Sequence, residues 1–281
     1  MEIWHHIVFT KSKHAGFCAY ITERGLVKPG SESKGTVQMD ISERNPYWID
    51  VQKYILENHV FSLSETSFTE KELSDASFLR VWSRWRCGYP QPEDGFAYRS
   101  ITYSEHNFCK VCGRGLFQQA PFWIKKTPNW GNRHFMMLNW VMDELFMDDT
   151  AKSVLLDAGI AGGGFRQVLN KKGTEVLPNI WQWDISKVLS AGVCFDNRSL
   201  DRITMCSACG GIKYHPTGVG MLPVRREVFM NAPDVMKTEE FFGSDHAAGR
   251  KIIVSQRIYR LLKDNRLTRG LVFEPIELVC I

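Results

Sequence analysis

Apolar residues are spaced unevenly along the chain, and their spacing predicts strands near the start and helices after them. The apolar residues of Ile3–Phe9 predict an opening strand, and the run Gly16–Thr22 predicts a second. Lys28–Gly35 contains Pro and Gly and is expected to be a loop, and Asn45–Pro46 begins a turn. Helical spacing then predicts a helix over Tyr47–Val60.

A second helix is predicted to start at Thr69. Thr69 and Glu72 have the spacing of a capping box, in which the hydroxyl and the carboxylate each bond a backbone amide at the helix start. The expected helix carries four apolar residues into a core and ends near Cys87–Gly88. These residues are Leu73, Leu79, Trp82 and Trp85. The later aromatic segment Pro121–Trp140 is also expected to be core, because no strong positive charge accompanies it.

Two later segments resemble one another in their order of strand, capped helix, glycine turn and strand. The first spans Leu145–Val168 with Asp148 as the helix N-cap, and the second spans Ile252–Ile276 with Ser255 as the N-cap. Equivalent positions in the two segments are 107 residues apart in the chain, as far as the glycine turn that ends each helix. We interpret this as an internal β-α-β duplication, with two unrelated segments of similar pattern as the alternative. The fold class expected is therefore α+β, built from β-α-β units.

Composition and charge exclude several classes of protein. The chain of 281 residues is 44% apolar and 23% charged, which is typical of a globular protein rather than a disordered one. No apolar run approaches the roughly 20 residues that a bilayer crossing needs. The start, Met1–His6, lacks the basic and apolar regions of a signal peptide, so we expect a cytoplasmic protein. A net charge of +4 does not require a nucleic-acid partner.

Four of the eight cysteines form two matched motifs, each C-x-x-C followed by Gly. They are Cys109-Lys110-Val111-Cys112-Gly113 and Cys206-Ser207-Ala208-Cys209-Gly210. Two intervening residues let a tight turn aim both sulfurs at one metal, and Gly accepts the positive φ that such a turn needs. Two such knuckles supply the four thiolates of a closed, structural zinc site holding one ion.

The separation of the knuckles and the chemistry of thiols leave an alternative. The 93 residues between Cys112 and Cys206 exceed the spacing in a compact zinc ribbon, so a substantial unit must be inserted there. Short hairpins are expected to hold the knuckles, the second one through Ile203 and Ile212–Tyr214. The alternative to a metal site is four buried or redox-active thiols.

The remaining cysteines and the histidines offer little catalytic chemistry. Cys18, Cys194 and Cys280 are expected to be inert, and Cys87 has no base paired with it in the sequence. His106 and His215 lie near the knuckles and could replace a thiolate or contact a ligand. The sequence has no H-E-x-x-H, G-x-S-x-G or kinase motif, so it offers no familiar set of catalytic residues. An enzyme using Cys87 or an open metal position is the weaker hypothesis.

The helix expected after Ser255 has a basic face. Arg257, Arg260 and Lys263 share one side, opposite Ile258 and the leucines that follow. We expect this face to be solvated. A docking surface for nucleic acid over residues 250–269 is the alternative, and it would make the chain a zinc-ribbon nucleic-acid-binding protein.

The chain is expected to have three regions: an N-terminal α+β region at 1–105, a knuckle region with an inserted strand-helix-strand unit at 106–214, and a β-α-β unit at 215–281. Within them, the two knuckles and three C-terminal segments resemble the double-CXXCG motif proteins, which include bacterial immunity proteins of polymorphic toxin systems. The C-terminal segments are Pro233–Met236, Ile252–Ser255 and Gly270–Ile276. The family's first knuckle usually lies nearer the N-terminus than residue 109, so this chain has an extended front end.

The resemblance implies a binding protein that is not an enzyme. It would bind a cognate toxin domain stoichiometrically and block or distort the toxin's active site, as part of competition between bacteria. Its zinc would be structural and would join two distant segments of the chain. The resemblance names neither the toxin nor the residues that contact it, and nucleic acid and membrane are not expected partners.

Overall fold

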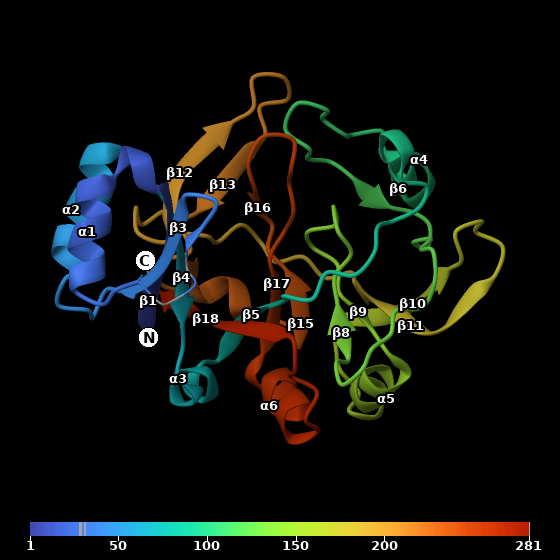
Figure 1. Cartoon of the computed structure of the whole chain (residues 1–281). Coiled ribbons are helices and arrows are strands. Elements are labelled where there is room, and N and C mark those ends of the chain that lie inside the picture. The colour runs from blue at the N-terminus through green and yellow to red at the C-terminus, as the bar shows by residue number, and fades with distance from the viewer. Residues whose placement is uncertain (28–29, 31, 281) are drawn as a thin grey trace. The chain divides into compact units, whose positions relative to one another are not determined.

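The computed structural model describes residues 1–27, 30 and 32–280 and contains both helices and strands (Figure 1). The predicted mixed α+β class is confirmed. The chain divides into two compact units, Met1–Thr69 with Thr217–Gly220, and Glu70–Pro216 with the chain from Met221 onward. Each unit has its own sheets and its own apolar core.

The smaller unit is an antiparallel sheet of order β2-β3-β1-β4 packed against two helices. Its elements are β1 (Glu2–Thr10), η1 (Lys11–Lys13), α1 (Ala15–Glu23), β2 (Glu32–Ser33), β3 (Thr36–Ser42), α2 (Trp48–Asn58) and β4 (Phe61–Ser67). Ile7 and Phe9 of β1 share a buried cluster with Phe17 of α1 and Val51 of α2. The opening strand predicted over Ile3–Phe9 and the helix predicted over Tyr47–Val60 are therefore confirmed.

The strand predicted over Gly16–Thr22 is wrong, because this segment forms helix α1. Its buried residues Phe17, Cys18 and Ile21 recur at the spacing of one helix face. In a short apolar run this spacing is hard to distinguish from that of a buried strand. In the loop predicted at 28–35, residues 28, 29 and 31 lie outside the described residues, and Glu32–Ser33 forms β2.

The described residues of the larger unit form two principal sheets of five and four strands and two smaller sheets, β12-β13-β16 and β6-β7. Its helices are α3 (Glu70–Asp75), η2 (Asp94–Phe96), α4 (Tyr98–Thr102), α5 (Asp149–Asp157), η3 (Arg226–Phe229) and α6 (Gln256–Asp264). Its strands are β5 (Phe78–Ser83), β6 (Tyr103–Ser104), β7 (Phe117–Gln118), β8 (Phe135–Met136), β9 (Phe146–Met147), β10 (Gly163–Leu169), β11 (Val176–Ile185), β12 (Leu200–Met205), β13 (Ile212–Pro216), β14 (Leu222–Arg225), β15 (Val235–Lys237), β16 (Phe241–Phe242), β17 (Ile252–Ser255) and β18 (Leu271–Val279).

Strand β5 is the centre of a five-stranded sheet of order β14-β18-β5-β17-β15. It pairs antiparallel with both β17 and β18, which come from the far end of the chain. The long helix predicted from Thr69 to Cys87 is therefore wrong. Helix α3 does begin at Glu70, but it ends at Asp75, and Leu79 and Val81 then alternate inward as in a strand.

The position of β5 also explains where the chain divides. Residues 70–105 supply the central strand of the C-terminal sheet, so they belong with the larger unit. Along the sequence the units divide after Thr69 and again on either side of Thr217–Gly220, whereas the boundaries expected were residues 105 and 214. A local hydrophobic pattern cannot reveal this, because the pairing joins segments about 170 residues apart in the chain.

The second principal sheet has the order β10-β11-β9-β8. Asp148 caps α5 as predicted, accepting the amide of Ala151 at 2.9 Å. The hydroxyl of Ser255, at the N-cap of α6, instead donates to Asp234. In both strand-helix-strand segments a third, antiparallel strand separates the two strands, β11 in the first and β5 in the second. The internal duplication stays a prediction.

Aromatic and aliphatic side chains of both sheets fill one core in the larger unit. In the segment 121–140, Phe122, Trp130 and Phe135 are buried, as predicted, whereas Trp140 is 43% exposed. Ile258 and Leu262 on one side of α6 are buried, and the basic residues opposite them are exposed. No helix within the described residues has the length and apolar character that a membrane crossing requires.

We expect Ile258→Ala to lower the free energy of unfolding of the larger unit by about 2–5 kcal/mol. Ile258 is fully buried in the core that both sheets share, so truncation removes apolar contacts and leaves a cavity. Arg260→Ala on the exposed face of the same helix is the matched control and should change stability by less than about 0.5 kcal/mol. Urea denaturation followed by circular dichroism measures both, and equal effects would contradict this packing.

Candidate metal centre

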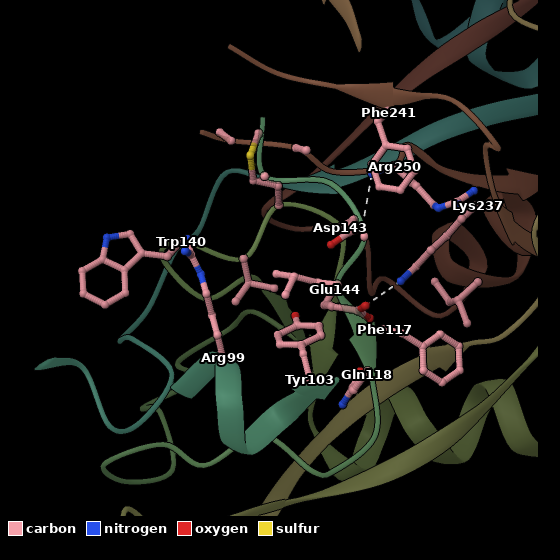
Figure 2. A pocket seen from close by; sticks show the side chains of 18 of the residues that line it. Arg99, Tyr103, Phe117, Gln118, Trp140, Asp143, Glu144, Lys237, Phe241 and Arg250 are labelled. Carbon is pink, nitrogen blue, oxygen red and sulfur yellow. Dashed lines mark hydrogen bonds and ion pairs between the residues drawn. The ribbon is translucent and has the colours of Figure 1, made fainter. Parts of the chain in front are cut away.

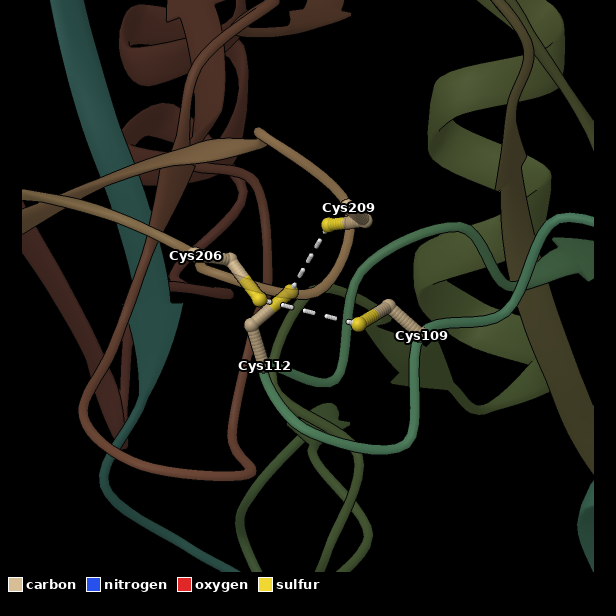
Figure 3. Close-up of side chains that lie close together, drawn as sticks. All are labelled: Cys109, Cys112, Cys206 and Cys209. Carbon is tan, nitrogen blue, oxygen red and sulfur yellow. Dashed lines mark hydrogen bonds between the residues drawn. The ribbon is translucent and has the colours of Figure 1, made fainter.

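The structure brings the four predicted cysteines together. The sulfur atoms of Cys109, Cys112, Cys206 and Cys209 all lie within 4.8 Å of one another (Figure 3). The Sγ atoms of Cys109 and Cys206 are 3.8 Å apart, and those of Cys112 and Cys209 are 3.6 Å apart. In a tetrahedral site with zinc–sulfur bonds of about 2.3 Å, the sulfurs are about 3.8 Å apart. The cluster therefore has the dimensions of a tetrathiolate metal site.

Both knuckles have the same backbone hydrogen bonds. In the first knuckle, the amide of Cys109 donates to the carbonyl of Arg114, and the amide of Gly113 donates back to the carbonyl of Cys109, both at 2.8 Å. The second knuckle repeats these bonds between the equivalent atoms of Cys206–Gly211, at 2.9 and 2.8 Å. Matching local sequences have thus produced matching turns, each presenting two sulfurs to the same point.

The glycine that follows each pair allows this turn. Gly113 has a φ of +79° and Gly210 a φ of +69°, both in the left-handed region that other residues rarely adopt. The two glycines differ in their surroundings. A Cβ atom on Gly113 would lie 2.1 Å from the carbonyl oxygen of His246, whereas nothing lies within 4 Å of one on Gly210. The first knuckle is therefore packed against the 246–248 segment, and the second is open at this point.

Each knuckle lies between two antiparallel strands. The first connects β6 to β7, and the second is the turn of the β12–β13 hairpin, where the strands around Ile203 and Ile212–Tyr214 were predicted. The sheet β10-β11-β9-β8 lies between them in the sequence, which accounts for the long separation. The cluster thus joins two segments of the larger unit that no continuous local structure connects.

Backbone amides and burial act on the thiols in opposite directions. The amide of Cys112 lowers the pKa of Cys109 to about 6, and the amide of Cys209 lowers the pKa of Cys206. Burial raises the pKa of Cys112 to about 12. A divalent cation bound to the four sulfurs would reverse the effect of burial, because it stabilises the thiolate directly.

A buried lysine accompanies the cluster. The ammonium of Lys213 donates to three carbonyl oxygens, those of Cys112 at 3.0 Å, Asp245 at 2.5 Å and Ala247 at 3.0 Å. These bonds satisfy the donors of the ammonium group. Their acceptors are neutral carbonyls, so the bonds do not balance its positive charge. Four thiolates around a divalent ion carry a net charge of −2. The position of Lys213 beside Cys112 therefore fits a negatively charged metal centre.

The histidines near the knuckles are not part of the cluster. His106 is exposed, and Nε2 of His215 contacts the hydroxyl of Thr204 at 2.9 Å. The metal-ligating group found among the described residues consists of the four cysteines alone. His246, which no pattern in the sequence indicated, has its Nδ1 3.0 Å from the carbonyl oxygen of Lys110 in the first knuckle. No motif connects these two positions, because they meet only through the fold.

The other cysteines lie outside the cluster. Cys18 is buried in α1, Cys87 and Cys194 are half-buried, and Cys280 is exposed. Cys87 packs at the edge of an apolar cluster that includes Trp130, and Cys194 contacts the carbonyl oxygen of Gly192. Cys18, Cys87 and Cys194 are therefore packed within the fold, whereas Cys280 is open to solvent.

Basic side chains of the 250–269 segment are partly engaged within the larger unit. Arg257 pairs with Asp234 at 2.8 Å, Lys263 pairs with Glu70, and Arg250 pairs with Glu239 at 3.0 Å. The exposed basic residues in the segment are Arg257, Arg260, Lys263, Arg266 and Arg269. Pairing with acids of the same chain reduces the positive charge that this face presents to an outside partner.

No protein-family model matches the chain, and no curated protein shows significant similarity to it. The case for a metal centre therefore rests on the geometry of the four cysteines and on the charges around them.

The two knuckle glycines should respond differently to substitution. Gly210→Ala is expected to cost about 1–2 kcal/mol, the strain of a left-handed alanine, because its surroundings are open. Gly113→Ala should cost more and should weaken metal retention, because its Cβ collides with the backbone of His246. Thermal unfolding and metal analysis of both variants test this. Equal losses of stability would show that the first knuckle is not packed as described.

Proposed function

We propose that the four-cysteine cluster holds one structural zinc ion. The single observation that carries this proposal is the convergence of two equivalent knuckles on one point, with sulfur separations that suit tetrahedral zinc. When bound, the zinc ion supplies folding free energy by joining the two knuckles. Cys109, Cys112, Cys206 and Cys209 would complete its coordination, which leaves no position for a substrate.

We further propose that the chain is an immunity protein of the double-CXXCG type. It would act in the cytoplasm, bind a cognate toxin domain one to one, and block that domain's active site without chemistry of its own. Support comes from the two CXXCG knuckles forming a single site, with the β17-α6-β18 segment following them. A closed tetrathiolate centre is suited to a scaffold for binding rather than to catalysis.

Nucleic-acid binding through the 250–269 segment has weaker support. Arg250, Arg257 and Lys263 are already paired with acids of the same chain. A surface that binds phosphates by releasing counterions needs several uncommitted cations. The remaining exposed arginines of the segment provide a small patch, so binding a toxin domain is the preferred function.

Zinc content and stability test the metal centre. The purified chain should contain one zinc ion with four sulfur ligands, measured by elemental analysis and X-ray absorption. Cys206→Ser should lose the ion and lower the melting temperature, because removing one ligand leaves the site incomplete. Cys194→Ser, at a half-buried thiol outside the cluster, is the matched control and should keep the ion. If chelation left the melting temperature of the wild-type chain unchanged, a structural role for the zinc ion would be excluded.

Toxicity rescue tests the proposed function. The chain should rescue cells that express the toxin domain encoded immediately upstream of it, and the two proteins should copurify as a one-to-one complex. Nucleic-acid binding is measured in parallel at low salt with the wild-type chain and Arg260→Glu. A steep salt dependence that Arg260→Glu reduces, together with no rescue and no complex, would favour the nucleic-acid alternative.

A further inference from the structure

A cavity of about 780 Å³ lies beside the first knuckle, within the larger unit. This volume is in the range of cavities that hold small molecules. One wall comes from the knuckle itself, through Gly113, Gly115 and Phe117, and another comes from α4 and the residues just before β9 (Figure 2). The cavity is separate from the four sulfurs, which face one another in the cluster.

The floor of the cavity is polar and internally paired. Glu144 and Lys237 are both buried and form an ion pair at 2.5 Å, and the amide of Gln182 donates to the other oxygen of Glu144 at 3.0 Å. Tyr103 lies beside this pair (Figure 2). Burial holds the pKa of Tyr103 well above its ordinary value, so its hydroxyl keeps its proton. The floor therefore offers hydrogen bonds without a net charge.

Two aromatic residues in unusual backbone conformations line the cavity. Phe96 and Trp140 have φ values of +58° and +67°, in a region where a bulky residue is strained. Their side chains are 41% and 43% exposed, and their ring centroids are 4.6 Å apart. Strain of this kind is found where a site needs a particular side chain in a particular place. Here it keeps two flat apolar faces partly open to solvent.

One cation and one carboxylate in the cavity lack an ionic partner among the described residues. Arg99 stacks on Phe96, with its guanidinium carbon 4.6 Å from the ring centre, and its buried Nε has no hydrogen-bond partner. The carboxylate of Asp143 accepts one bond, from the amide of Arg250 at 3.3 Å. The cavity's other arginines are paired, Arg166 with Asp184 and Arg250 with Glu239. Arg99 and Asp143 are thus the charges left for a ligand.

We propose that this cavity binds a small aromatic ligand that carries both an anionic group and a hydrogen-bond donor. The ring lies against Trp140 and Phe96, the anion bonds the guanidinium of Arg99, and the donor bonds the carboxylate of Asp143. Charge-assisted bonds of this kind are among the stronger polar contacts in proteins. Two sources share the required chemistry, a purine nucleotide and an aromatic amino acid.

Calorimetry on the metal-loaded chain tests the proposal, with adenosine 5′-monophosphate and L-tryptophan as probes. One of them should bind one to one. Its counterpart without the anion, adenosine or L-tryptophan amide, should bind at least about tenfold more weakly. The probe that binds identifies the source. No saturable binding of either probe at millimolar concentration would overturn the proposal.

Substitutions then locate the bound probe. Arg99→Gln and Asp143→Asn should each weaken binding about tenfold or more, whereas the exposed Arg269→Gln should leave it unchanged. If a variant in the cavity fails to fold, fluorescence supplies the same information. Adenosine 5′-monophosphate stacked on Trp140 changes the emission of the wild-type chain, and Trp140→Phe removes that change. L-tryptophan emits light itself, so its binding is followed instead by calorimetry on Trp140→Ala, which should weaken it. Binding that is insensitive to Arg99→Gln and without effect on Trp140 emission would place the probe elsewhere and overturn the proposal.

Discussion

The four cysteine sulfurs of the two knuckles must meet at one point, and the arrangement of the larger unit around the knuckles depends on this constraint. The knuckles are 93 residues apart, against about 15–20 in a compact zinc ribbon. Each doubling of a loop adds about 0.6 kcal/mol of closure entropy, so the longer separation costs roughly 1.5 kcal/mol more. A structural zinc ion contributes about 10–16 kcal/mol on binding. The separation is therefore a small obstacle to a site with this chemistry, and a complete sheet can form between the knuckles.

The knuckles were predictable because their information is local. C-x-x-C-G encodes a turn within five residues, and the structure repeats that turn with the same hydrogen bonds at both places. The N-cap at Asp148 and the helix at α2 were predictable for the same reason. Strand β5 was not, because its residues follow a helix start and contain enough apolar residues to continue the helical pattern. Its conformation is decided by hydrogen bonding to β17 and β18, which the local sequence does not encode.

The surroundings of the candidate sites were also outside the reach of the sequence. Lys213 is an unremarkable lysine in a strand until the fold places its ammonium against the carbonyl of Cys112. His246 and the cavity lining come from segments far apart in the chain. The positive φ values of Phe96 and Trp140 have no signature in composition, since Gly and Asn are the residues that usually predict such a backbone. A site built from residues far apart in the chain can be recognised only once the fold is known.

The four-cysteine cluster and the cavity share a stretch of backbone, so the first knuckle also shapes the cavity. Gly113 packs against His246, and the chain then runs through Gly115 to Phe117, which lines the cavity. Lys213, whose ammonium bonds the carbonyl of Cys112, also bonds the carbonyls of Asp245 and Ala247, and Ala247 lines the same cavity. A zinc ion at the cluster would therefore hold the wall of the cavity in place without contacting a ligand inside it. The fold thus places the four-cysteine cluster where a metal ion bound to it would also order one wall of the cavity.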